Sequence, residues 1–362
     1  MKTITVAIDC RLIGQSGIGT FIENVVYHIV NTPDMLFVLV GEKKKLEPYA
    51  LRENCTIVEC NYPSFSLKEL FCFPTKEVNR CDAFFTPFFN IPLGIRVPIF
   101  STIHDVVFFD VEGMCSPIGK LIRRFFIQRA LNISAKVFTV SNFSKSRIEA
   151  LFSPSCPVVV CSSGISEELK KYRNQHPPIR PQDKKDNIVY LGNLKKHKGL
   201  HVLLAAFKQF REALPQSKTT LTIIGNIDFR TKDEKIESLL HQHDDRIIFL
   251  RGASNDTVFK TLREAKLLVS PSEYEGLGLP PMEAMFLGTS AIISDIPVYQ
   301  EIYGQSPAIF FKMGDAADLA GKIISQIPTI NPIIDNLVAT KHNFQHISTL
   351  ILKEITSTAF QS

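Results

Sequence analysis

Two glutamates in a segment rich in glycine and proline are the residues whose types and spacing point most directly to chemistry. Glu275 and Glu283 stand eight positions apart within residues 270–284, with two glycines and two prolines between them. The apolar run over 266–270 leads into this segment and predicts a buried strand. A carboxylate accepts hydrogen bonds from neighbouring hydroxyl groups, so the two side chains could hold two sugar rings.

A helix is predicted directly after the two prolines. Residues 282–287 favour a short helix that ends at Gly288, and Pro281 suits its first position because the missing N–H needs no partner there. Glu283 then falls in the first turn, behind a glycine loop. The amides of that loop belong to Gly276, Leu277 and Gly278. Loop and helix-end N–H groups attract a diphosphate, so the segment predicts a sugar-nucleotide site. An ordinary helix start is the alternative.

A basic loop within residues 187–200 supplies the opposite charge. A predicted strand ends at Gly192, and a helix is expected to start near Gly199. Lys198 stands where its point charge could meet a diphosphate at that helix end. Such a cation would stabilise a leaving nucleoside diphosphate, on which negative charge grows in the transition state. A loop whose lysines are simply solvated is the alternative.

The segment 270–284 resembles the E-x7-E segment of the family 4 retaining glycosyltransferases, and the similarity extends from Gly14 to about Gly304. Members of that family adopt the GT-B fold, an α/β fold of two Rossmann-like parallel-sheet domains that face a central cleft. The resemblance implies transfer of a sugar from a nucleoside diphosphate, with retention of the anomeric configuration and without a metal. No isolated D-x-D motif stands out as a metal–diphosphate clamp, since Asp244-Asp245 lacks that context.

The resemblance also implies roles for single residues. Glu283 would hold the ribose, Glu275 the transferred sugar, and Lys198 the diphosphate. Where the family usually has an arginine this chain has Asn193, so Lys195 or Lys196 could make that contact instead. The expected donor-binding residues are Gly17, Asn193, Lys198, Glu275, Gly276, Leu277, Gly278 and Glu283.

Two segments of the first half are expected on the acceptor side. Gly17 and Gly19 open a predicted helix, so the backbone there can approach a ligand closely. Their order, G-x-x-G-x-G, differs from the G-x-G-x-x-G of a dinucleotide site. His104 and Asp105 follow a buried strand, at the end where parallel sheets bind ligands.

For these segments the resemblance implies contacts with both substrates. Gly17 would lie near the donor diphosphate, His104 would bond a sugar hydroxyl or the reacting centre, and Asp105 would orient the ring. A structural turn and a structural histidine are the alternatives. The residues expected to act in catalysis are His104, Lys198 and Glu275, and those expected on the acceptor side are Gly17, Gly19 and Asp105.

Composition bounds the class of protein. The 362 residues are 45% hydrophobic and 21% charged, as expected for a globular chain of two domains. A net charge of +5 is too weak to argue for a nucleic-acid partner. The eight cysteines form no C-x2-C pair, so zinc is not expected, and reduced thiols in the cytoplasm are the plain interpretation. Residues 1–9 predict a strand instead of a signal peptide.

Predicted strands and helices alternate along the chain, which indicates α/β domains with parallel sheets. Seven strands are predicted in the first half and five in the second. Polar, proline-rich residues at 173–187 are expected to link an acceptor-side domain over 1–172 to a nucleotide-sugar domain over 188–340. The tail over 341–362 favours a helix, which in resembling proteins often crosses back to the first domain.

One predicted helix, over 117–131, is both apolar and basic. Its cations are Lys120, Arg123, Arg124 and Arg129. A helix packed on the sheet with a charged outer face is one interpretation, and peripheral docking on the anionic cytoplasmic face of the inner membrane is the other. Docking predicts that removal of the charges at Arg123 and Arg124 weakens liposome binding, and an unchanged sedimentation profile would count against it.

Together these features predict a hexosyltransferase that uses a nucleoside-diphosphate sugar and a hydroxyl of a glycan or lipid-linked acceptor, with no cofactor. Resembling proteins commonly build bacterial O-antigen, capsule or exopolysaccharide, and GDP-mannose is the leading expectation for the donor. One alternative is a noncatalytic nucleotide-sugar-binding scaffold subunit, which Asn193 favours and Lys198 and both glutamates oppose. Another is a GT-B-like sugar-nucleotide epimerase, which the E-x7-E segment opposes.

Overall fold

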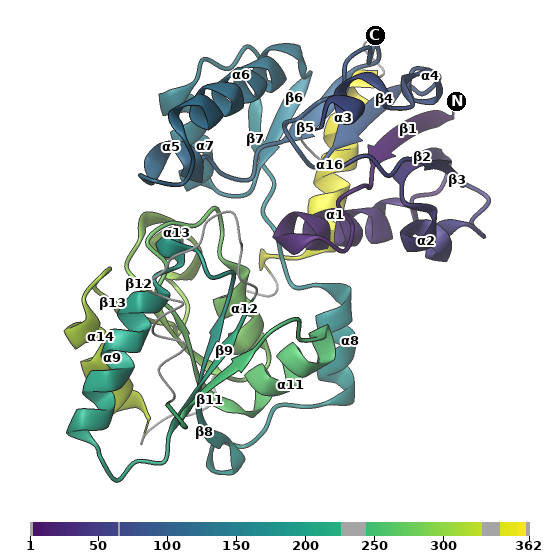
Figure 1. Ribbon diagram of the computed structural model, residues 1–362. Coiled ribbons are helices and arrows are strands. Elements are labelled where there is room, and N and C mark those ends of the chain that lie inside the picture. Colours follow the sequence, from purple (N-terminus) through teal and green to yellow (C-terminus); the bar gives the residue numbers. More distant parts are fainter. Residues whose placement is uncertain (1–2, 64–65, 226–243, 328–340, 360–362) are drawn as a thin grey trace. The chain divides into compact units, whose positions relative to one another are not determined.

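The computed structural model describes residues 3–63, 66–225, 244–327 and 341–359. The chain forms two compact units: unit 1 combines residues 1–166 with 343–362, and unit 2 comprises residues 167–342 (Figure 1). These boundaries differ from the predicted ones. Unit 1 ends at 166 instead of 172, whereas the C-terminal helix belongs to unit 1, as expected of a tail that crosses back to the first domain.

Unit 1 contains a seven-stranded sheet in which every strand pairing is parallel. The strand order is β3-β2-β1-β4-β5-β6-β7. Their bounds are β1 Ile4–Asp9, β2 Met35–Gly41, β3 Cys55–Glu59, β4 Ala83–Thr86, β5 Ile99–Thr102, β6 Lys136–Thr139 and β7 Val158–Val160. The strands are almost continuously apolar because helices cover both faces of the sheet.

On one face of this sheet, the first and last helices of the chain pack together. They are α1 (Ser16–Ile29) and α16 (Phe344–Ala359), and both contribute to one apolar core with inward side chains of the strands. Ser348 Oγ donates a hydrogen bond to the carbonyl of Val25 at 3.3 Å, and Lys136 forms an ion pair with Glu354. Residues distant in sequence therefore close the core of unit 1.

On the other face, a second core is covered by different helices. These are α3 (Leu67–Phe71), α4 (Thr75–Val78), α6 (Pro117–Ile133) and α7 (Asn142–Leu151), with the short α5 (Val107–Asp110) packed against the same core through Phe109. The short α2 (Lys43–Leu46) instead contributes Leu46 to the first core. Val78, Ile127 and Ile148 are fully buried here against strand residues. Ser116 and Ser141 cap α6 and α7 by accepting from backbone N–H groups.

Unit 2 contains a six-stranded sheet, also with parallel pairings throughout, in the order β10-β9-β8-β11-β12-β13. The strands are β8 Lys185–Leu191, β9 Thr220–Ile224, β10 Ile247–Leu250, β11 Ala265–Ser270, β12 Ser290–Ser294 and β13 Ile309–Phe311. Its helices, in the part of the unit that the structure describes, are α8 Glu167–Gln175, α9 Leu200–Ala213, α11 Asn255–Glu264, α12 Leu279–Phe286, α13 Pro297–Tyr303 and α14 Ala316–Gln326. The edge strand β13 adds to the five predicted ones.

The prediction that residues 173–187 form a linker is wrong. The segment begins inside α8 and ends inside β8, because two apolar side chains anchor α8 within unit 2. Leu169 and Tyr172 are buried, and the Tyr172 ring lies 5.4 Å from that of Phe259 on α11. Arg263 Nε donates to the carbonyl of Pro177 at 2.7 Å, so the chain after α8 is tied to the same helix.

Among the described residues, no helix has the length and apolar character needed to cross a bilayer. All eight cysteines are free thiols, and four of them are buried. Burial raises the pKa of the Cys81 thiol to about 11 and that of Cys161 further. Such thiols stay protonated and unreactive at neutral pH.

Candidate active site

A lysine and a glutamate that are 77 positions apart meet at the carboxyl edge of the unit 2 sheet. Lys198 ends the 3-10 helix η3 (Lys196–Lys198) after β8, and Glu275 lies in the loop after β11. Lys198 Nζ donates to Glu275 Oε1 at 2.6 Å, and both side chains are largely shielded from solvent. Because β8 and β11 are adjacent parallel strands, the loops that follow them share one edge. Ser272 Oγ also donates to Glu275 Oε1, at 2.9 Å.

The two loops that carry this pair are in direct backbone contact. Glu273 N donates to the carbonyl of His197 at 2.8 Å. Gly199, the residue between η3 and α9, has φ of 66°, and a Cβ built on it would lie 1.9 Å from the carbonyl oxygen of Pro271. A glycine at 199 is therefore required both by its backbone conformation and by the close approach of the loop that leads to Glu275.

We expect Gly199→Ala to lower thermal stability and to abolish donor binding. A side chain at this φ costs roughly 1–2 kcal/mol, and the clash with Pro271 forces the Lys198 loop and the Glu275 loop apart. Thermal melting and nucleotide-sugar titration measure the two effects. Gly252→Ala is the matched control, because Gly252 has φ of 58° but a Cβ added to it would meet no atom within 4 Å. Equal losses in both variants would contradict the role of the close approach.

The glycine loop after Glu275 ends at a helix, as predicted, but the helix begins earlier than expected. α12 starts at Leu279, so Pro281 is its third residue, and Glu283 is its fifth and lies beyond the first turn. Both prolines fit because the N–H groups of the first turn have no partner within the helix. At the other end, Gly288 has φ of 81°, and the helix terminates there as the sequence indicated.

Glu283 is partly buried on α12, and this burial raises the pKa of its carboxyl group to about 7. Near neutral pH the side chain is therefore divided between its neutral and charged forms. A carboxyl group with this balance can accept a proton or release it when a ligand supplies hydrogen bonds. Perturbed carboxyl groups of this kind are concentrated at functional sites.

Two tyrosines that sequence reasoning did not identify support the glycine loop. Gly278, with φ of 79°, approaches Tyr299 so closely that a Cβ there would lie 2.3 Å from ring atom Cε1. Tyr303 donates a hydrogen bond to the carbonyl of Gly278, and the Tyr299 hydroxyl lies 2.7 Å from Ser270 Oγ. Their spacing of four residues on α13 was the available signal, because it places both rings on one helix face.

Asn193 occupies the loop between β8 and η3, with an exposed side chain. Its carbonyl oxygen accepts a hydrogen bond from the Tyr190 hydroxyl at 3.1 Å, which fixes the backbone at this point. The neighbouring Lys196 is exposed as well, whereas Lys198 is directed to Glu275. The loop thus carries one lysine that contacts Glu275 and one that faces solvent.

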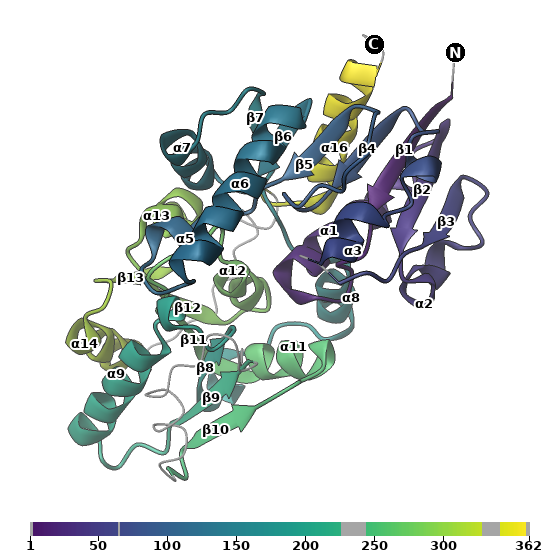
Figure 2. The ribbon, with the colours of Figure 1, turned by 45° about the horizontal axis from the view of Figure 1, so that its top comes forward.

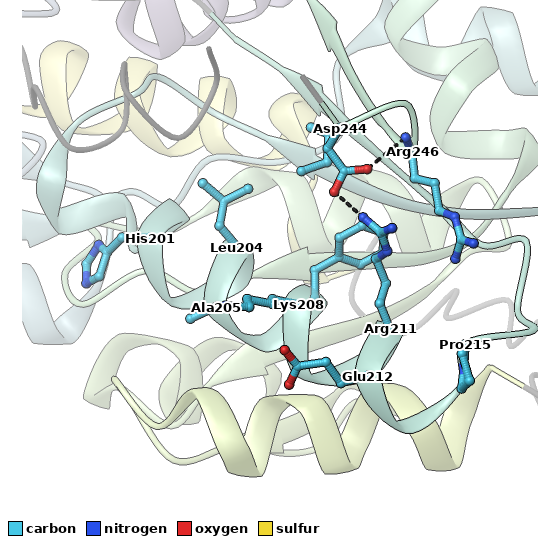
Figure 3. A pocket seen from close by; sticks show the side chains of 11 residues that line it. His201, Leu204, Ala205, Lys208, Arg211, Glu212, Pro215, Asp244 and Arg246 are labelled. Atoms are coloured by element: carbon cyan, nitrogen blue, oxygen red, sulfur yellow. Dashed lines mark hydrogen bonds and ion pairs between the residues drawn. The ribbon is translucent and has the colours of Figure 1, made fainter. Parts of the chain in front are cut away.

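A hollow of about 660 Å³ elsewhere in unit 2 contains none of the predicted site residues. It lies beside α9, where Asp244 accepts hydrogen bonds from Arg211 and from the backbone N–H of Arg246 (Figure 3). The Asp244 carboxylate is thus occupied by protein donors. We assign no part of the candidate site to this hollow.

In unit 1, the two predicted glycines differ in their surroundings. Both lie in the first turns of α1, after β1. A Cβ on Gly19 would lie 2.3 Å from the carbonyl oxygen of Leu12, so this glycine is required for packing. A Cβ on Gly17 would meet no atom within 4 Å, and the residue is exposed. Gly17 therefore has the accessible backbone expected of a ligand-binding position, whereas Gly19 shapes the turn.

His104 and Asp105 follow β5 at the carboxyl edge of the unit 1 sheet. His104 Nε2 lies 3.0 Å from the carbonyl oxygen of Pro87, and the Phe21 ring packs against the imidazole edge-on. Burial lowers the pKa of His104 to about 4, so the imidazole is neutral at pH 7. Asp105 Oδ1 accepts from Val107 N at 3.1 Å and so fixes the start of α5.

A buried ionic cluster at the end of β1 was not predicted. Arg11 donates to Asp9 through Nε at 2.8 Å and Nη2 at 2.7 Å, and its Nη2 also lies 3.0 Å from Glu69 Oε1. Burial alone would lower the pKa of Arg11, but the two carboxylates raise it overall. The cluster ties α3 to the turn that leads into α1. An aspartate and an arginine directly after an apolar strand were the available signal.

Two parallel-sheet α/β units, with polar residues gathered at the carboxyl edge of each sheet, define the GT-B fold of glycosyltransferases. Residues 171–327 match the family model described as Glycosyl transferases group 1, so unit 2 carries a domain of that family. The chain thus has the GT-B fold, and it resembles O-antigen mannosyltransferases in sequence.

Particular relatives support this assignment. The O-antigen chain mannosyltransferase RfbU of Salmonella typhimurium is 26% identical over 252 residues, which cover 69% of this chain and 67% of that protein. An uncharacterized glycosyltransferase of Methanocaldococcus jannaschii is 28% identical over 241 residues, or 62% of this chain and 59% of its own length. The structure of HepE from Anabaena in complex with UDP and glucose has a TM-score of 0.71 at 16% identity, and the match covers 98% of this chain and 100% of HepE.

Proposed function

We propose that this protein is a retaining, metal-independent glycosyltransferase that moves a hexosyl group from a nucleoside diphosphate to a hydroxyl acceptor. The contact of 2.6 Å between Lys198 and Glu275 carries this proposal. It joins a cation suited to a diphosphate with a carboxylate suited to sugar hydroxyls, at the edge where parallel sheets bind ligands. The positive charge of Lys198 takes the place that a metal ion would otherwise fill beside the leaving group.

Donor binding is proposed to divide this ion pair. The diphosphate competes for Lys198, and the Glu275 carboxylate becomes available to the sugar hydroxyls while Ser272 Oγ keeps its hydrogen bond to Glu275 Oε1. As the bond between the anomeric carbon and the diphosphate oxygen breaks, its electron pair passes to the diphosphate. Lys198 stabilises the charge that grows there. The acceptor oxygen then bonds to the anomeric carbon on the same face, and its proton passes to the leaving phosphate.

The other residues of unit 2 are proposed to bind the nucleotide. Glu283 accepts hydrogen bonds from the ribose hydroxyls, in its charged form. The N–H groups at Gly276 and Gly278 face the diphosphate at the start of α12, where the helix dipole favours negative charge. Asn193 contributes a neutral side chain at the same edge.

In unit 1, His104 is proposed to accept a hydrogen bond from a sugar hydroxyl. Its Nε2 faces the carbonyl oxygen of Pro87, which places the proton on Nε2 and leaves Nδ1 as an acceptor. A neutral imidazole suits this role, and its lowered pKa keeps it neutral. Asp105 and the exposed backbone at Gly17 complete the proposed acceptor side.

We propose GDP-mannose as the donor and a glycan or lipid-linked hydroxyl of a bacterial surface polysaccharide as the acceptor. The O-antigen mannosyltransferase relatives support this choice of sugar and pathway class. The Anabaena neighbour was solved with UDP and glucose, so uridine donors belong in the same experiment. Eight free thiols suit a reducing compartment, and we place the reaction in the cytoplasm.

The test is donor binding and slow donor hydrolysis across GDP-, UDP-, dTDP- and ADP-sugars, with and without a chelator. We expect one donor to turn over in the presence of chelator, which fixes the base and supports a metal-independent enzyme. Binding of a donor without turnover, even with candidate acceptors, would favour a noncatalytic scaffold subunit. No binding of any donor would overturn the assignment of Lys198, Glu275 and Glu283.

A further inference from the structure

Among the described residues, the partners of Glu275 all meet one of its two carboxylate oxygens. Lys198 Nζ donates to Oε1 at 2.6 Å, and Ser272 Oγ donates to the same oxygen at 2.9 Å. No donor in the described part of the chain bonds to Oε2. An ionised carboxylate accepts hydrogen bonds at both oxygens, so Oε2 is the oxygen that is left for a ligand.

The two donors on Oε1 differ in how they respond to a bound diphosphate. Lys198 is a flexible cation with 23% of its side chain exposed, and in the proposed reaction it turns to the diphosphate. Ser272 has a short, neutral side chain and is 2% exposed, so it has no comparable attraction to the anion. In the donor complex, Ser272 is therefore the protein donor that still holds Oε1.

Ser272 is itself fixed from the neighbouring strand. Its carbonyl accepts a hydrogen bond from Ser294 Oγ at the end of β12, and Ser294 is fully buried. Because β11 and β12 are parallel neighbours, both end at the same edge of the sheet, and α13 follows there (Figure 2). The sheet thus fixes the backbone of Ser272, from which its hydroxyl reaches Glu275.

A buried tyrosine of α13 aligns the Ser272 hydroxyl. The Tyr299 hydroxyl lies 2.7 Å from Ser270 Oγ, and it also hydrogen-bonds with Ser272. Burial raises the pKa of Tyr299 well above its ordinary value, and these hydrogen bonds offset the rise only in part, so the hydroxyl keeps its proton. Ser272 gives its one proton to Glu275 and can therefore only accept from Tyr299. The hydrogen bonds thus run in one direction, from Ser270 through two hydroxyl groups to Glu275.

Tyr299 also contacts the other end of the loop that carries Glu275. A Cβ at Gly278 would lie 2.3 Å from Tyr299 Cε1, so the ring packs directly on that glycine. Ser270 is the last residue of β11, and Gly278 directly precedes α12. One fully buried side chain therefore fixes both ends of the loop.

We infer that Ser272 and Tyr299 are positioning residues for the transferred sugar. They hold Oε1 of Glu275 so that Oε2 meets the sugar hydroxyls once Lys198 has turned to the diphosphate. The two residues thus serve recognition of the sugar and not of the nucleoside diphosphate. The inference deepens the proposed function and rests on it, because it requires Lys198 to bind the diphosphate.

The test compares binding of GDP, which lacks the sugar, with binding and hydrolysis of GDP-mannose. We expect Ser272→Ala to bind GDP as the unaltered chain does. The same variant should bind GDP-mannose about tenfold more weakly and hydrolyse it roughly 10- to 100-fold more slowly, the effect of one lost hydrogen bond to a charged group. Titration calorimetry and initial rates are the measurements. UDP and UDP-glucose replace this pair if the donor screen selects uridine.

The double variant Ser272→Ala/Glu275→Ala separates positioning from a direct role. If Ser272 acts through Glu275, its removal from the Glu275→Ala chain should change the affinity for GDP-mannose by less than about twofold. A further tenfold loss would show that Ser272 acts independently of Glu275, and would overturn the inference.

Ser348→Ala is the matched control, because Ser348 is also 2% exposed and also donates one hydrogen bond, but within unit 1. It should bind both ligands as the unaltered chain does. Thermal melting shows whether each variant folds. If Ser272→Ala does not fold, Tyr299→Phe takes its place, since it removes only the hydroxyl group, and it should slow hydrolysis by about threefold with GDP affinity unchanged.

Two results would overturn the inference while the proposed function stands. One is unchanged binding and hydrolysis of GDP-mannose by Ser272→Ala, and the other is an equal loss of affinity for GDP and GDP-mannose. If the unaltered chain binds no donor at all, the proposed function fails, and this inference fails with it.

Discussion

Lys198→Ala is expected to reduce turnover of the donor by about 100- to 1,000-fold, the range seen when one preorganised electrostatic group is removed. The variant loses the cation that stabilises the leaving diphosphate. It also leaves Glu275, now without its partner at 2.6 Å, as a negative charge beside the anionic group. Both effects oppose bond cleavage, so the loss should appear in kcat. Initial rates of donor hydrolysis or of transfer to an acceptor measure it.

Lys196→Ala is the matched control for this experiment. Lys196 belongs to the same loop, two residues away, but its side chain is exposed, and Glu275 pairs with Lys198 instead. Lys196→Ala should therefore retain near-normal turnover. Far-UV circular dichroism should show that both variants fold. Near-normal turnover of Lys198→Ala would remove that residue from the mechanism, and equal losses in both variants would attribute the effect to loop charge in general.

Donor affinity is expected to fall by about tenfold for each pH unit below 7. Burial raises the pKa of Glu283 to about 7 in the ligand-free protein, so below that pH its carboxyl group is mostly protonated. Ribose hydroxyls that donate hydrogen bonds favour the charged form, so binding must release the proton, at about 1.4 kcal/mol for each pH unit. Titration calorimetry with an intact sugar nucleotide is the measurement, because its diphosphate does not titrate in this range.

Glu283→Gln tests the origin of that slope. The variant should bind donor more weakly at pH 8 and with little dependence on pH, whereas Glu275→Gln should keep the slope. The raised pKa also means that ionisation of Glu283 favours the unfolded chain as pH rises from 4.5 to 7. Ligand-free Glu283→Gln should therefore gain more thermal stability at pH 8 than at pH 5. A pH slope that survives in Glu283→Gln would assign it to another group.

The two parallel sheets could be predicted because strands covered on both faces have continuous apolar sequences. Strand β13 was missed since only three residues form it, two of them partly exposed, and its pairing with β12 depends on the finished sheet. The helix α8 was missed for a related reason. Its sequence is polar and precedes prolines, and Leu169 and Tyr172 alone anchor it, so composition indicated a linker.

Residues of the candidate site could be predicted where a single loop holds the characteristic motif, as around Glu275 and around Lys198. The direct contact between Glu275 and Lys198 could not be predicted, because the register of β8 against β11 decides which loop residues meet. Tyr303 likewise escaped prediction, since its hydrogen-bond acceptor, the carbonyl of Gly278, is 25 positions away. Arg11 was missed because an arginine after a strand is usually exposed, and the carboxylates of Asp9 and Glu69 offset the cost of its burial.

The packing of α16 on α1 makes unit 2 an insertion within unit 1, which has consequences for synthesis. Residues 167–342 are contiguous, so unit 2 can fold as soon as it leaves the ribosome. Unit 1 is synthesised first but closes its core only when residues 344–359 emerge from the ribosome. Val25 of α1, for example, must wait 323 positions for its hydrogen-bond partner Ser348. During that interval the apolar surface of α1 and β1 is open to chaperones and to aggregation. Synthesis thus begins with unit 1, but unit 2 is the first of the two units to complete its fold.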